Sequence, residues 1–126
     1  NGPDIARVCG KYPDVSHLRH MEDTRSISVG SNMPSFAWML TNPLDNSTLV
    51  KKIAVQRLLG VPYPNWTPEQ IMTRVDTQAR AIAARLKADG AYVAPDREII
   101  ALIAYLQQLG HSQPVAPAAP AIAKRE

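Results

Sequence analysis

A strong helix-start signal at residues 67–70 constrains this chain more than any other feature. Thr67 offers a hydroxyl as N-cap, Pro68 suits the first helical position, and Gln70 can return a hydrogen bond to the cap. The apolar residues that follow recur at helical spacing up to a stop signal at Asp89-Gly90. The predicted apolar stripe consists of Ile71, Val75, Ala79, Ile82 and Leu86. The sequence therefore predicts one long amphipathic helix here, with Arg74, Arg80, Arg85 and Lys87 in water.

Three further segments, residues 14–21, 44–60 and 95–109, also show helical spacing. Asp14 would be the N-cap of the first of these helices. The side chains expected to face inward are Val15, Leu18 and Met21 in the first segment, Leu49, Ile53 and the Leu58-Leu59 pair in the second, and Ile99, Leu102, Ile103 and Leu106 in the third. Because no segment shows a convincing strand pattern, the predicted fold class is all-α.

The remaining segments carry turn and loop signals. Residues 1–12 are predicted to form a short helical turn that leads into a loop. Residues 23–42 are predicted to be an irregular segment rich in Ser, Thr and Asn. The Pro-Ala-rich end of the chain is typical of an extended or disordered tail. We therefore expect one domain over residues 1–110 and a disordered tail over residues 111–126.

Charge and hydrophobicity argue against several classes of protein. The 14 Lys and Arg residues exceed the 11 Asp and Glu residues only slightly and are spread along the chain, so no nucleic-acid-binding face is predicted. The apolar runs are shorter than the roughly 20 residues that span a bilayer. Cys9 is the single cysteine, which excludes an internal disulfide, and we expect it to be a small packed side chain. No C-x-x-C-H occurs, so the chain has no site for covalent haem attachment and no proximal histidine beside one.

Several ordered motifs nevertheless point to a haem protein. The stretch Ser31-Asn32-Met33-Pro34-Ser35-Phe36-Ala37-Trp38 looks like a methionine loop that offers a thioether to haem iron. The other motifs are Gly2-Pro3-Asp4-Ile5-Ala6-Arg7-Val8, Gly10-Lys11-Tyr12, His17, His20, Arg25, Leu59-Gly60-Val61-Pro62-Tyr63 and Ala101-Leu102-Ile103-Ala104-Tyr105-Leu106. Over residues 1 to about 110, this set resembles the mono-haem cytochrome c subunit (subunit II) of cbb3-type cytochrome c oxidases.

This resemblance implies a class I cytochrome c-like helical domain that is truncated at its N-terminus. In the family, a membrane helix and the C-x-x-C-H segment precede the region seen here, on the periplasmic face of the bacterial inner membrane. The natural protein would bind haem c and pass electrons to the oxygen-reducing subunit in aerobic or microaerobic respiration. Its partners would be the catalytic and di-haem cytochrome subunits. The fragment itself is expected to be soluble, to hold no covalent haem and to have no catalytic bond-making residue.

The resemblance also implies roles for individual residues. Met33 would be the distal axial ligand of the iron, and the backbone carbonyl of Pro3 would accept a hydrogen bond from the proximal histidine. Arg7, Tyr12 and Trp38 would line the haem or its propionates.

The sequence departs from the family pattern at three places. Cys9 stands where a glycine is usual, Ser28 and Val29 interrupt a usual Val-Pro step, and residues 64–95 are longer than in typical members. Two alternatives to a cytochrome stay open: a haem-free helical interaction module and, ranked last, a basic nucleic-acid binder. His17 and His20 have a spacing that could hold a metal, but no carboxylate or cysteine completes such a site, so structural or haem-proximal histidines are preferred.

The last predicted helix would lack the N-terminal helix on which it packs in class I cytochromes. We therefore expect its apolar face either to associate with a second copy of the chain or to be covered by the long helix that starts at Thr67.

Overall fold

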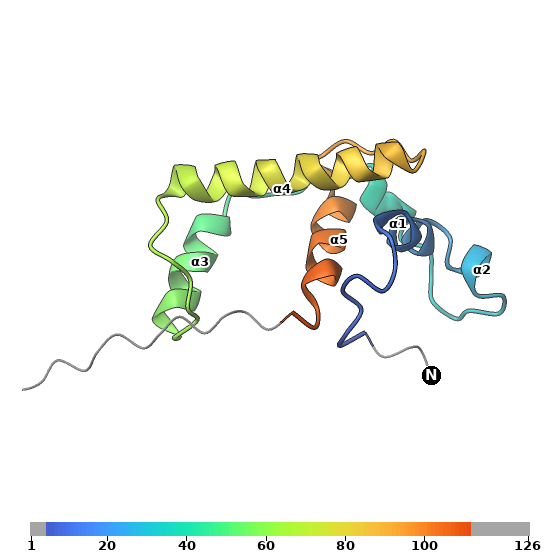
Figure 1. The fold of residues 1–126 in the computed structure, drawn as a ribbon, viewed down its shortest axis with the longest axis horizontal. Helices are drawn as coiled ribbons and strands as arrows, with labels where there is room; N and C mark the ends of the chain where they lie inside the picture. Colours follow the sequence, from blue (N-terminus) through green and yellow to red (C-terminus); the bar gives the residue numbers. More distant parts are fainter. Residues whose placement is uncertain (1–4, 112–126) are drawn as a thin grey trace, which may run out of the picture.

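The computed structural model describes residues 5–111, and every regular element in this part of the chain is a helix (Figure 1). In order, the elements are α1 (Asp14–Glu22), α2 (Thr24–Ile27), the 3-10 helix η1 (Ala37–Leu40), α3 (Leu49–Leu58), α4 (Pro68–Ala88) and α5 (Glu98–Gln108). A single antiparallel bridge joins Pro43 to Arg97 within this range. The all-α prediction is confirmed. The predicted tail lies, from residue 112 onward, outside the described residues, so its boundary stays a prediction.

The long helix α4 forms as its local signals predict. The Gln70 backbone N–H donates to the Thr67 hydroxyl at 3.3 Å, and the Thr67 N–H donates to the Gln70 side-chain oxygen at 3.0 Å. This capping box satisfies two backbone donors that a helix start otherwise leaves unpaired. At the other end Gly90 adopts a φ of +82°, which ends the helix. Three of the five residues of the predicted stripe are buried, namely Ile71, Ile82 and Leu86.

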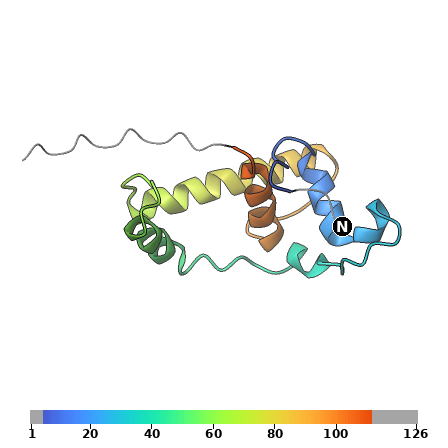
Figure 2. The ribbon, with the colours of Figure 1, turned by 90° about the horizontal axis from the view of Figure 1, so that it is seen from below.

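The hydrophobic core lies where α5 packs against the C-terminal half of α4 (Figures 1 and 2). Ile99 and Ile103 of α5 are fully buried together with Leu86 of α4, and Leu18 of α1 completes the cluster. Ile100 is buried as well, although the predicted stripe did not include it. The apolar face of α5 is thus covered by α4, which is the second of the two outcomes expected for it.

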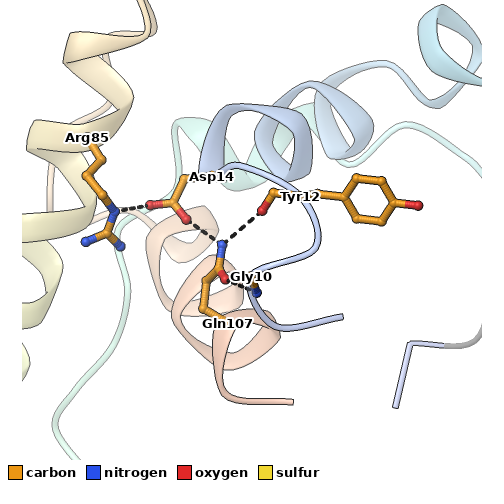
Figure 3. Close-up of polar contacts among 5 residues, drawn as sticks. All are labelled: Gly10, Tyr12, Asp14, Arg85 and Gln107. Carbon is orange, nitrogen blue, oxygen red and sulfur yellow. Dashed lines mark hydrogen bonds and ion pairs between the residues drawn. The ribbon is translucent and has the colours of Figure 1, made fainter. Parts of the chain in front are cut away.

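Asp14 does not cap α1. Pro13 occupies the N-cap position without a side-chain hydrogen bond, and Asp14 is the first helical residue. Its carboxylate accepts one hydrogen bond from Arg85 Nε at 2.6 Å and another from Gln107 Nε2 at 2.7 Å (Figure 3). The N-cap prediction was wrong because this buried carboxylate binds side chains of α4 and α5 instead of its own helix. For the same reason Arg85, which was predicted to lie in water, is half-exposed and paired.

Gln107 also ties the N-terminal segment to the end of α5 (Figure 3). Its side-chain oxygen accepts from the Gly10 N–H at 3.1 Å, and its Nε2 donates to the Tyr12 carbonyl at 3.3 Å. The Cys9 N–H adds a bond to the Leu109 carbonyl at 3.0 Å. The first described residues are therefore held by the last helix.

The approach of these two segments requires a glycine at position 110. A Cβ at Gly110 would lie 3.0 Å from Arg7 Cα, and the φ of Gly110 is +93°. Cys9 needs no such freedom, because none of the described non-glycine residues has a positive φ. Gly10, at φ +65°, makes the turn instead, so the cysteine in the usual glycine position is accommodated.

The predicted helix over residues 44–60 is shorter and less buried than expected. It covers only α3, because Asp45 accepts a hydrogen bond from the Ser47 N–H at 2.8 Å and forms a turn before it. Leu58 and Leu59 were predicted to face inward, but they are 87% and 79% exposed. That prediction was wrong because α3 does not pack on the α4–α5 core.

Two other boundaries differ from the sequence prediction. The segment over residues 23–42, which was predicted to be irregular, contains two short helices, α2 and η1. Helix α5 starts at Glu98 and not near Pro95, because the preceding residues bind the segment before α3. The Leu44 N–H donates to the Asp96 carbonyl at 2.8 Å, and the Glu98 N–H donates to the Asn42 carbonyl at 3.1 Å.

Candidate functional site

The backbone around Met33 is fixed by hydrogen bonds from both sides. The hydroxyl of Thr24, a residue only 2% exposed at the start of α2, donates to the Met33 carbonyl at 2.7 Å. The Met33 N–H donates to the Ser31 hydroxyl at 3.2 Å. The Met33 side chain itself is half-buried. The methionine therefore lies in an irregular but anchored loop, which is what a fixed ligand position requires.

The chain after Met33 returns to α1. The Ser35 hydroxyl donates to the Glu22 carbonyl at 2.6 Å, and the Phe36 N–H donates to the Met21 carbonyl at 2.8 Å. Both bonds connect the loop to the end of α1 just before η1 begins. The loop is thus held at its start by α2 and at its end by α1.

The other three described residues that were predicted to line a haem lie on the surface of the molecule. Arg7 is exposed, Tyr12 is 42% exposed and Trp38 is 51% exposed. The Trp38 ring packs against Phe36, with 6.3 Å between ring centroids. The segments that carry these residues, 5–13 and η1, lie beside α1 and away from α3 (Figures 1 and 2). Pro3 lies outside the described residues.

Two cavities in the described part of the chain lie elsewhere. One of about 450 Å³ is bounded by α4, α5 and the segment before α3, and another of about 530 Å³ lies between α3 and α4. Neither is lined by Met33, Arg7, Tyr12 or Trp38. The structure therefore does not enclose the predicted residues in either of these two cavities.

The donor set fits one half of a haem site. Within residues 5–111, no three His, Cys, Asp or Glu side chains lie close enough to hold a metal ion. A methionine thioether is an established axial ligand of haem iron in cytochromes c. Four large apolar side chains are exposed before α1 and from α2 to η1, and they offer surface that a macrocycle and its surrounding chain could cover: Ile5, Ile27, Val29 and Trp38. The Met33 thioether is compatible with a haem, but the described residues do not supply the walls that would enclose the macrocycle.

His17 is a buried polar residue whose environment the sequence did not reveal. It is 8% exposed, and its Nε2 has no hydrogen-bond partner. Its ring meets the Tyr12 ring edge-on at 6.2 Å between centroids. Burial lowers the pKa of His17 below its ordinary value, the Asp14 carboxylate opposes this shift, and His20 adds to it. In the sequence, His17 stands next to Leu18, which was predicted to face inward. That position does not distinguish a buried histidine from a half-exposed one.

His17 should make the stability of the chain depend on pH. Because its pKa is lowered from 6.5 in the folded state, the unfolded chain binds the proton more readily. The free energy of unfolding should therefore fall as the pH drops below about 6.5. Urea unfolding of wild type and His17→Phe at about pH 7.5 and about pH 5.5 measures this dependence. The dependence should shrink in His17→Phe and persist in His111→Phe, a control at an exposed position. Equal pH dependence in all three proteins would contradict the assignment.

Comparison with known proteins decides the family. The family described as "Cytochrome C oxidase, mono-heme subunit/FixO" matches residues 1–113 of the 126-residue chain. The chain belongs to this family. No curated protein sequence matches it.

Membership of the FixO family confirms the resemblance found in the motifs. The family is the mono-haem subunit of a cytochrome c oxidase, so the chain belongs to a subunit of an electron-transport complex with oxidase partners. Its helical fold agrees with a cytochrome c-like domain. In the described part of this FixO chain, no helix has the length and hydrophobicity of a membrane-spanning segment.

Proposed function

We propose that this FixO chain supplies the methionine side of a c-type haem site and passes electrons through that haem to the oxygen-reducing subunit. The observation that carries the proposal is the Met33 loop, in which Thr24 and Ser31 fix the backbone on either side of the thioether. Family membership supplies the requirement for one haem. The haem, when bound, supplies reversible one-electron chemistry at its iron.

The chain's own residues would hold and shield the redox centre. Met33 would bind the iron through sulfur, which raises the reduction potential relative to a second histidine. Arg7 would bind a propionate, and Tyr12 and Trp38 would exclude water from the edge of the ring. Pro3 would orient the proximal imidazole through its backbone carbonyl.

The covalent attachment of haem needs residues beyond this sequence. Two cysteines followed by a histidine bind haem c, whereas this chain has Cys9 alone. We therefore place C-x-x-C-H, together with a membrane helix, in the natural polypeptide outside these 126 residues, with the haem domain on the periplasmic face of the inner membrane. The catalytic and di-haem cytochrome subunits are the proposed partners.

The decisive experiment is the visible spectrum of the natural subunit, expressed with c-haem maturation machinery, in wild type and Met33→Ala. The sulfur-to-iron charge-transfer band of the oxidised haem should vanish in Met33→Ala, and the reduction potential should fall. Met72→Ala is the matched control, since Met72 is exposed on α4. A band that survives in Met33→Ala would identify another ligand. A wild-type subunit without any haem c would favour a helical interaction module.

A further inference from the structure

Helix α3 stands apart from the core of the molecule. None of its residues is buried, and Figures 1 and 2 show it beside the N-terminal half of α4, away from α5. We call residues 46–66 the α3 arm. The inward face of the arm is partly in contact with α4, because Ile53 and Trp66 line the same cavity as Ile71 of α4. The arm is therefore attached to α4, and none of residues 5–111 covers the exposed side chains on its outer side.

The outer side of the arm is unusually apolar for a free surface. Val55 is 53% exposed, and Leu58 and Leu59 are 87% and 79% exposed. Val61 and Tyr63, which follow the helix, are exposed as well. We call these five residues the arm patch. A helix with apolar side chains on both its inner and outer faces is normally buried, so the arm patch is expected to contact a partner.

The charge of the arm indicates the chemistry of that partner. Residues 46–66 contain Lys51, Lys52 and Arg57 and no Asp or Glu. Two copies of the arm would place like charges together, which disfavours self-association through it. A surface that presents carboxylates around an apolar groove would complement both the cations and the leucines.

The distribution of residues also favours a protein partner over a lipid surface. A helix that lies in a membrane interface separates its apolar face from its charged face. In α3, Lys51, Val55 and Leu58 recur at i, i+4 and i+7, so a cation shares the face of the exposed apolar side chains. A helix face that carries both cations and apolar side chains suits a protein groove with a charged rim.

We propose that the α3 arm is a docking element for another subunit of the oxidase, which receives the arm patch in an apolar groove bordered by carboxylates. This inference rests on the membership of the chain in an oxidase complex that the proposed function assumes. The docking surface lies at the opposite end of the molecule from the Met33 loop (Figure 1). Docking and haem ligation can therefore be tested separately.

The test uses the assembled oxidase, purified through a tag on the catalytic subunit, and measures how much of this subunit is retained at rising salt. The double variant Leu58→Glu/Leu59→Glu should lose at least about tenfold in retention, because it adds charge to the patch and repels an acidic groove. Lys51→Glu/Lys52→Glu should also lose retention, with a weaker dependence on salt. Tyr92→Glu, at an exposed aromatic residue in the loop between α4 and α5, is the matched control and should behave as wild type. Circular dichroism of each variant chain should match wild type, since the replaced side chains are exposed.

Three results would overturn the docking proposal. The first is wild-type retention of Leu58→Glu/Leu59→Glu. The second is a dimer of the isolated chain in sedimentation that this variant abolishes, and the third is binding to anionic phosphatidylglycerol vesicles that it abolishes. Retention is quantified by mass spectrometry and not by haem absorbance. A subunit that lacks haem c would therefore refute the proposed electron transfer while the retention measurement still decides the docking.

Discussion

Replacing Ile103 by alanine should lower the free energy of unfolding of the chain by about 2–5 kcal/mol. Ile103 is fully buried in the cluster that joins α4, α5 and α1. The substitution removes apolar atoms and leaves a cavity in a site with few means of collapse, because Ile99 and Leu86 beside it are also fully buried. This loss is a large share of the roughly 5–15 kcal/mol by which domains are stable.

Urea unfolding followed by circular dichroism measures the effect of Ile103→Ala. The matched control is Leu58→Ala, which removes an aliphatic side chain that is 87% exposed. The control should change the free energy of unfolding by less than about 0.5 kcal/mol. Equal losses in the two variants would mean that α3 is packed and that the α4–α5 core is not where the structure places it.

Replacing Asp14 by alanine should lower the free energy of unfolding by about 1.5–3 kcal/mol. The Asp14 side chain is 4% exposed and accepts hydrogen bonds from Arg85 and Gln107, so its loss leaves the Gln107 amide without this partner. Arg85 is more than half exposed and can return to water, which limits the cost of losing the ion pair. Because Gln107 also binds the Gly10 N–H, hydrogen exchange at Gly10 should become faster.

The matched control for Asp14→Ala is Asp76→Ala. Asp76 forms an ion pair with Arg80 one turn along α4 at 2.7 Å, but both side chains are exposed. Its replacement should therefore change stability little and leave exchange at Gly10 unaffected. If Asp76→Ala destabilised the chain as much as Asp14→Ala, the contacts that join α1 to α4 and α5 would not be the cause.

Helix α4 could be predicted because its determinants are local. The capping box involves residues three apart, and the stripe that ends at Leu86 follows from helical period alone. The apolar face of α5 could be predicted for the same reason. The partner of that face depends on tertiary packing. The sequence therefore left open both a second copy of the chain and α4, and the structure has α4 on it.

The errors occurred where distant contacts override local patterns. Asp14 has the sequence position of an N-cap, but its partners lie 71 and 93 residues away. Leu58 and Leu59 have an inward-facing pattern, but a pattern does not show whether a helix reaches the core. Asp14 binds partners that are remote in sequence, whereas α3 does not pack on the α4–α5 core, and periodicity contains no information about either.

The candidate site was found through motifs and not through periodicity. Met33 could be singled out only because its neighbours form an ordered set with Arg7, Tyr12 and Trp38. The hydrogen bond from Thr24 that fixes the Met33 backbone had no sequence signal, since threonine is common in loops. The roles of these four residues and of Pro3 rest on the family resemblance and await the Met33→Ala spectrum.

The link between Gln107 and the segment from Gly10 to Asp14 has a consequence for how the protein is made. These contacts span 93 to 97 residues, so the N-terminal segment cannot reach its final position until α5 has been synthesised. The segment from Gly10 to Asp14 is thus translated well before the side chain that fixes it in place. During that interval it stays open to any factor that must reach it before folding closes.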